Sequence, residues 1–172
     1  ASIAELSVLV RDADAVLAVV NVIGNAIGEP GARSLIEVFD ANPRLQSLLG
    51  VKPGSTSADF SQTNMQPHDC IILAHELKAS RAAAVMKKVA LSSNPLTGGK
   101  PKRLGGGKYA QTDGKDISGV SVLFPSMTQV TELDVSNCGL GPTSMPDLAK
   151  LVCDATAALV SINLSGNRAI DQ

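Results

Sequence analysis

Apolar residues recur along the chain in a short frame that is repeated five times. The frame is Lxx(L/V/I)x(L/V/F)xx(N/C/T)x(L/I/M), and its copies span 17–27, 55–65, 86–96, 130–140 and 159–169, of which 55–65 is degenerate. The fourth and sixth positions of each copy are apolar, as at Val89 and Leu91. Spacing of two places both side chains on one face of a strand. The frame therefore predicts five short strands, each with one face in the core.

The ninth position of each copy comes directly after the predicted strand and carries a small residue. These residues are Asn25, Thr63, Asn94, Cys138 and Asn167. The backbone bends there and frees N–H and C=O groups, which a short side chain can satisfy inside the turn. If the copies stack, these residues form a structural ladder along the molecule.

The stretches between the copies have the apolar spacing of helices. We expect helices at 31–42, 67–80 and 142–156, and a weaker one at 116–127, where Pro125 lies near the end. Strands that alternate with helices predict an α/β fold with a parallel sheet of about five short strands and helices on the convex side. The copies are unevenly spaced, which indicates insertions and, around Leu45 and Leu48, a half-formed extra copy.

The copies that contain LDVSNCGL and INLSGNRA resemble the ribonuclease-inhibitor-like class of leucine-rich repeats. The resemblance covers 15–96 and 116–170 and implies a single leucine-rich-repeat solenoid domain over 1–172. It also implies binding of other proteins, often through the concave sheet, and no cofactor. The chain departs from the class in its small number of copies and uneven spacing. The segment 45–61 also resembles stretches in solenoid proteins of single-celled algae and other protists.

Composition narrows the class of protein further. Hydrophobic residues make up 44% of the chain and aromatic residues only 2%, so the core must be aliphatic. The net charge of −1 predicts no broad attraction to nucleic acid or to a membrane surface, and no apolar run is long enough to span a bilayer. Three cysteines, an odd number, favour free thiols in a reducing compartment. We therefore expect an intracellular protein, cytoplasmic or inside an organelle after removal of a transit peptide.

Two segments stand outside the frame at its start and at its end. Residues 1–15 are mixed and acidic, unlike a secretory signal, and predict a short N-terminal capping helix. The last copy ends at Ala169 with no helix after it, which would leave a strand edge and part of the core uncovered. Either the natural chain is longer, or a partner protein covers this edge, and we favour the partner.

The outward strand positions predict a concave face that is small, polar and mildly acidic. The acidic side chains are Asp59, Glu132 and Asp134, and no Trp, Tyr, Phe or Arg lies among the outward positions. Binding hot spots are enriched in Trp, Tyr and Arg. Two interpretations remain open, namely a partner-binding face that uses these carboxylates and an ordinary solvated sheet face.

A Gly/Lys-rich insertion at 97–116 separates the third copy from the fourth. Around the only tyrosine it places basic residues, so the candidate partner-binding set is Lys100, Lys102, Arg103, Lys108 and Tyr109. The spacing of a phosphate-binding loop is absent. The insertion is interpreted either as a flexible solvated loop or as a basic arm that docks on an acidic partner and orders upon binding.

The chain has few residues that could carry catalysis or bind a metal ion. His68 and His75 lie seven residues apart on one predicted helix, which separates them by about 10 Å, too far for one metal ion. We predict no catalytic residue, no metal and no cofactor. The sequence favours a non-catalytic protein–protein interaction module, a peripheral structural subunit or adaptor of a larger assembly. The alternative is a regulator of another enzyme, an inhibitor or GTPase activator, that acts through the solenoid surface.

Overall fold

The computed structural model describes residues 17–153, apart from 80, 82, 105–107 and 113, together with 158–167, Glu5 and Val8. The predicted capping helix at 1–15 therefore lies, except for Glu5 and Val8, outside the described residues. The described chain has a mixed α/β architecture, as the sequence predicts.

A four-stranded parallel sheet forms from the last four copies of the frame. Its strands are β1 (Ser57–Asp59), β2 (Lys88–Ala90), β5 (Glu132–Asp134) and β6 (Ser161–Asn163), in the spatial order β1-β2-β5-β6. Ala58 is paired with Val89, Val89 with Leu133, and Leu133 with Ile162. The fourth positions of these four copies are thus in register, so their side chains meet on one face of the sheet.

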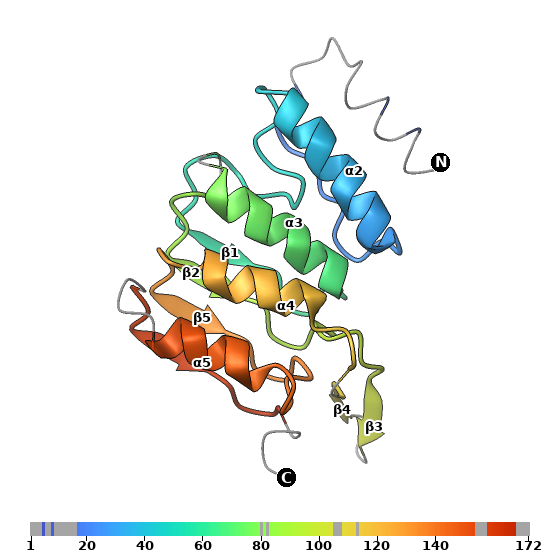
Figure 1. Ribbon diagram of the computed structural model, residues 1–172, viewed down its shortest axis with the longest axis vertical. Helices are drawn as coiled ribbons and strands as arrows, with labels where there is room; N and C mark the ends of the chain where they lie inside the picture. Colours follow the sequence, from blue (N-terminus) through green and yellow to red (C-terminus); the bar gives the residue numbers. More distant parts are fainter. Residues whose placement is uncertain are drawn as a thin grey trace.

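Helices cover that apolar face of the sheet. They are α2 (Gly28–Ala41), α3 (Pro67–Lys78), α4 (Ser118–Leu123) and α5 (Met145–Cys153), and they lie side by side in one layer (Figure 1). The weak helix expected at 116–127 is split into α4 and a 3₁₀ turn, η1 (Phe124–Ser126). Pro125 explains the split, since it has no N–H to continue an α-helix.

The core lies between the sheet and the helices and is mainly aliphatic, although Phe39, Phe60 and Phe124 are also buried in it. Val89, Leu91, Leu133 and Val135 are each at most 3% exposed. Burial of such a side chain stabilises the fold by about 1.5–3 kcal/mol. In the last copy, the equivalent Ile162 and Leu164 are only half-buried. The core is therefore less covered at the β6 end than in the middle of the sheet.

The first copy of the frame forms no strand of this sheet, so the described chain has four parallel strands instead of about five. Val19 and Asn21 form isolated bridges, the first parallel to Ser47 and the second antiparallel to Leu49. The half-formed copy around Leu45 and Leu48 thus pairs with the backbone of the first copy, where a regular strand would otherwise pair.

The position directly before the ladder residue is left-handed in all five copies. The residues are Gly24, Gln62, Ser93, Asn137 and Gly166, with φ of 74°, 58°, 59°, 50° and 76°. This conformation suits glycine and is unfavourable for most other residues. The eighth position of the frame is therefore a second repeated backbone feature, one that the apolar pattern does not reveal.

Candidate partner-binding surfaces

The turns after the strands are fixed by buried carboxamides. Asn94 Nδ2 donates to Leu91 O (2.9 Å) in its own copy and to Phe60 O (2.7 Å) in the preceding copy, while its Oδ1 accepts from Met65 N (2.9 Å). Asn167 repeats this pattern, with Val135 O at 2.8 Å and Cys138 N at 2.8 Å. Each of the two carboxamides therefore joins its own turn to the neighbouring copy.

The other predicted ladder positions make weaker links. Cys138 donates its thiol to Leu91 O at 3.1 Å, and burial raises the pKa of this thiol to about 12. Asn25 Nδ2 and Thr63 Oγ1 bond to the carbonyl three residues earlier, at 2.9 Å and 2.7 Å. Among the described residues, their side chains make no hydrogen bond to another copy. The ladder thus joins copies only from the second copy onwards.

The carboxylates on the open face of the sheet, away from the helices, already have partners within the fold. Asp59 Oδ1 accepts from Ser61 N and Asp134 Oδ1 from Ser136 N, both at 2.9 Å. Hydrogen bonds from Ser61 lower the pKa of Asp59. Glu132 is paired with Lys88 at 2.7 Å. Lys88 therefore offsets the charge of one acidic side chain of the expected patch, and a serine N–H occupies one oxygen of each of the other two.

The insertion at 97–116 contains a β-hairpin where the sequence favoured a loop. Strands β3 (Lys102–Leu104) and β4 (Lys108–Ala110) are antiparallel, and Arg103 is paired with Tyr109. The hairpin projects from one side of the body formed by the sheet and helices (Figure 1).

Hydrogen bonds anchor the base of the hairpin to the turn of the fourth copy. Gln111 N donates to Asn137 Oδ1 at 2.9 Å, and Ala110 is 6% exposed. Thr97 Oγ1 donates to Gly139 O at 3.0 Å and accepts from Gly114 N at 2.8 Å. These bonds hold the insertion at both of its ends, so the hairpin has a defined position on the body.

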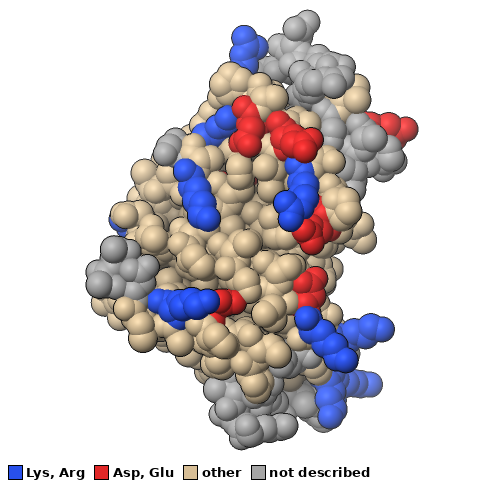
Figure 2. Space-filling model, in the orientation of Figure 1, with Lys and Arg blue, Asp and Glu red and all other residues tan. Residues whose placement is uncertain are grey.

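The insertion concentrates positive charge at one corner of the molecule. The insertion holds five basic and two acidic residues, a net charge of +3, so a total of −1 leaves −4 for the rest of the chain. Lys100, Lys102 and Arg103 are exposed; Lys108 and Tyr109 lie in β4, with side chains outside the described residues. Figure 2 shows Lys and Arg side chains gathered at this corner of the molecule.

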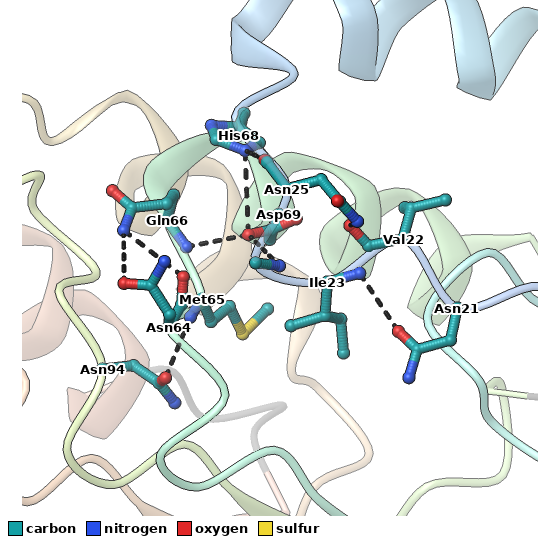
Figure 3. A network of polar contacts seen from close by, with 11 residues as sticks. Asn21, Val22, Ile23, Asn25, Asn64, Met65, Gln66, His68, Asp69 and Asn94 are labelled. Carbon is teal, nitrogen blue, oxygen red and sulfur yellow. Dashed lines mark hydrogen bonds and ion pairs between the residues drawn. The ribbon is translucent and has the colours of Figure 1, made fainter. Parts of the chain in front are cut away.

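The two histidines have separate structural partners. Asp69 is buried at the start of α3 and accepts from Gln66 N (2.9 Å) and Gly24 N (3.4 Å), while His68 Nε2 lies 2.9 Å from Asn25 O (Figure 3). Burial raises the pKa of Asp69. The other histidine, His75, is paired with Asp40 on α2 at 2.7 Å. Within the described residues, no group of three His, Cys, Asp or Glu side chains could hold a metal ion.

Comparisons with known proteins give little further guidance. No protein-family profile matches the chain, and no curated protein matches it. Among solved structures, the chain is similar to the C-terminal domain of tropomodulin from Caenorhabditis elegans. The TM-score is 0.43 and the identity 14%, over 96% of this chain and 83% of that one, a likeness too weak to carry an argument. In the part of the chain that the structure describes, no helix is long and apolar enough to cross a membrane.

Proposed function

We propose that this chain is a leucine-rich-repeat solenoid of the ribonuclease-inhibitor-like class that acts as a non-catalytic protein-binding module. Its repeated frame, its in-register strands and the carboxamides at Asn94 and Asn167 support the solenoid assignment. Its role is that of a peripheral subunit or adaptor in a larger assembly, and its partner is another protein.

The partner docks on the β3–β4 hairpin rather than on the open sheet face. The observation that carries this proposal is an anchored, projecting hairpin that gathers exposed basic side chains at one corner of the molecule. Lys102 and Arg103 are exposed and form no ion pair among the described residues, whereas Glu132 on the sheet is already paired. An exposed cluster of one sign steers a complementary partner and orients it on contact.

A charge-reversal experiment tests this proposal. The tagged protein is expressed in its native cell, its co-purifying proteins are identified, and the affinity for each purified partner is measured. The hairpin variant is Lys102→Glu with Arg103→Glu. The matched control is Lys52→Glu with Lys78→Glu, which makes the same change in net charge at exposed positions outside the insertion.

We expect the hairpin variant to bind its partner at least about tenfold more weakly than the wild type, mainly through slower association at low salt. The control should stay within about threefold of the wild type, because surface charges far from an interface act only through a screened field. Equal affinities for the two variants would show that the hairpin is not the docking site.

A further inference from the structure

We propose that the hollow at the base of the hairpin holds the main chain of an extended acidic peptide, whose carboxylates pair with the hairpin. This inference rests on the proposed protein-binding function and adds the chemistry of the partner. It concerns a surface at the turn edge of the sheet that the apolar pattern of the sequence does not reveal.

The hollow has a volume of about 420 Å³ and is uncharged and polar. Its lining residues come from three successive copies and from the insertion: Gln62, Asn64, Ser93, Pro95, Gln111 and Asn137. Four of these six residues have carboxamide side chains. A carboxamide carries an acceptor oxygen and two donor hydrogens, so it can pair with both the C=O and the N–H of a peptide bond.

One side of the hollow is rigid. Asn137 Nδ2 donates to Ser93 Oγ at 3.1 Å, and Asn137 Oδ1 accepts from Gln111 N at 2.9 Å. Ser93 and Asn137 are also held in left-handed turns. These side chains are therefore fixed before a ligand arrives, which reduces the entropy lost on binding.

The remaining carboxamides have unused hydrogen-bonding capacity. Gln111 Oε1 is buried and accepts no hydrogen bond within the described residues, and Gln111 Nε2 lies 3.5 Å from Ser93 O, a long contact. The exposed side chain of Gln62 makes no hydrogen bond to any described residue. A buried acceptor without a donor is unfavourable, and the long contact of Nε2 holds the Gln111 carboxamide only weakly, so this side chain can turn toward a ligand N–H in the hollow.

The basic hairpin adjoins the hollow because Gln111 directly follows β4. Thr112 Oγ1 also donates to Lys100 O at 2.8 Å, which ties the start of the insertion to its end. Lys102 and Arg103 lie on β3, which leads away from the hollow, and Lys100 lies two residues before this strand. A peptide whose backbone lies on the carboxamides could place Asp or Glu side chains beside them, and Arg103 could bind a carboxylate with two parallel hydrogen bonds.

The lining of the hollow favours an acidic peptide over a nucleic acid. A nucleic acid carries a phosphate at every nucleotide, and the lining offers no Lys or Arg side chain to pair with phosphates along that path. A short peptide with a few carboxylates confines its charge to the hairpin. The uncharged hollow also suits the neutral main chain of a peptide.

Fluorescence anisotropy with three labelled probes tests the inference. The first probe is a ten-residue peptide of alternating Glu and Ser, the second is the same peptide N-methylated at every second residue, and the third is a ten-nucleotide oligouridine. Each probe is titrated with the wild type, with Gln111→Ala, with Lys102→Glu/Arg103→Glu and with the Lys52→Glu/Lys78→Glu control. Because Gln111→Ala keeps the backbone bond to Asn137, we expect it to fold, and thermal unfolding by circular dichroism checks this.

We expect the acidic peptide to bind the wild type and the control. Gln111→Ala and N-methylation should each weaken binding about tenfold, since each removes hydrogen bonds between the peptide main chain and the carboxamides. The hairpin variant should weaken it further. Unchanged affinity on N-methylation, unchanged affinity in Gln111→Ala, or tighter binding of oligouridine would each overturn the inference.

The failure of this inference is separable from failure of the proposed function. If the acidic peptide does not bind while the native partner still depends on Lys102 and Arg103, the hairpin docks a partner of other chemistry and only this inference falls. If the native partner is indifferent to the hairpin, the proposed docking site falls as well.

Discussion

Replacement of Glu76 by glutamine should make the stability of the fold less sensitive to pH. Glu76 is a buried residue of α3, 1% exposed, and holds the segment that bridges the first copy. Its Oε1 accepts from Leu48 N at 2.5 Å and its Oε2 from Ser47 Oγ at 2.9 Å. A glutamine can keep the bond from Leu48 N, so the variant should fold while losing the ionisable group.

Burial sets both the direction and the size of the effect. Desolvation raises the pKa of Glu76 from its ordinary value of 4.5 to about 7, against the opposing influence of the hydrogen bonds from Leu48 and Ser47. Between pH 4.5 and pH 7 the folded state therefore binds more protons than the unfolded state. The stabilising contribution is fully present below pH 4.5 and is lost as pH rises to about 7. The difference in pKa corresponds to about 3 kcal/mol, a large part of the 5–15 kcal/mol by which domains are stable.

Urea unfolding at pH 4.5, 5.5, 6.5 and 7.5 measures this effect. The free energy of unfolding of the wild type, minus that of Glu76→Gln, should fall by about 3 kcal/mol across this range. Other titrating groups, such as buried Asp69, are common to both proteins and cancel in the difference. Glu37→Gln, at an exposed position on α2, is the matched control and should give a flat difference. A flat difference for Glu76→Gln as well would mean that this carboxyl ionises near pH 4.5 in the folded state, which would refute the reasoning.

Three further changes follow from the turns and their neighbours. Asn94→Ala should destabilise the fold by about 3 kcal/mol in urea, because it removes three buried hydrogen bonds and leaves Met65 N without its acceptor, whereas Asn25→Ala, which loses one part-buried bond, should cost under about 1 kcal/mol. Gly24→Ala should lower the melting temperature more than Gly166→Ala, since both positions are left-handed but only the first places a new Cβ 2.6 Å from a backbone oxygen. Arg81→Met should cost about 2–3 kcal/mol, because Arg81 donates to Phe39 O in the last turn of α2 and to Leu45 O beyond it, and stacks over the Phe39 ring. Faster amide exchange in the last turn of α2 would report the loss.

The arrangement of the sheet could be predicted from the sequence, but the pairing of the first copy could not. Val89 and Leu133 alternate with outward-facing residues, and this local pattern alone places them on the core side of adjacent strands. The bridges of Val19 and Asn21 depend on a segment about 28 residues later, held by the buried Glu76 carboxylate. Such a pairing leaves no periodic trace in the sequence, because it is decided by tertiary contacts.

The candidate surfaces show a similar division. Lys100, Lys102 and Arg103 are exposed as the sequence predicts, and the glycines between Leu104 and Lys108 are a turn signal that would have favoured a hairpin. The hydrogen bond from Ser61 N to Asp59 also has a local signal in the sequence, because a serine follows the aspartate two residues later. The same spacing follows Asp134. The hollow beside the hairpin has no such signal, because its lining residues come from distant turns that only the fold brings together.

The thiol of Cys138 makes a weak link between the third and fourth copies, and this boundary is called the seam below. A sulfhydryl is a weak donor, so the rung between the third and fourth copies is weaker than the carboxamide rungs on either side. The insertion spans this seam, since Thr97 and Gln111 bond to the turn that contains Cys138. Amides on the two sides should therefore exchange with solvent as two separate cooperative units, and occupancy of the hairpin base should merge them into one. The proposed docking site would thus also control whether the two halves of the protein open together.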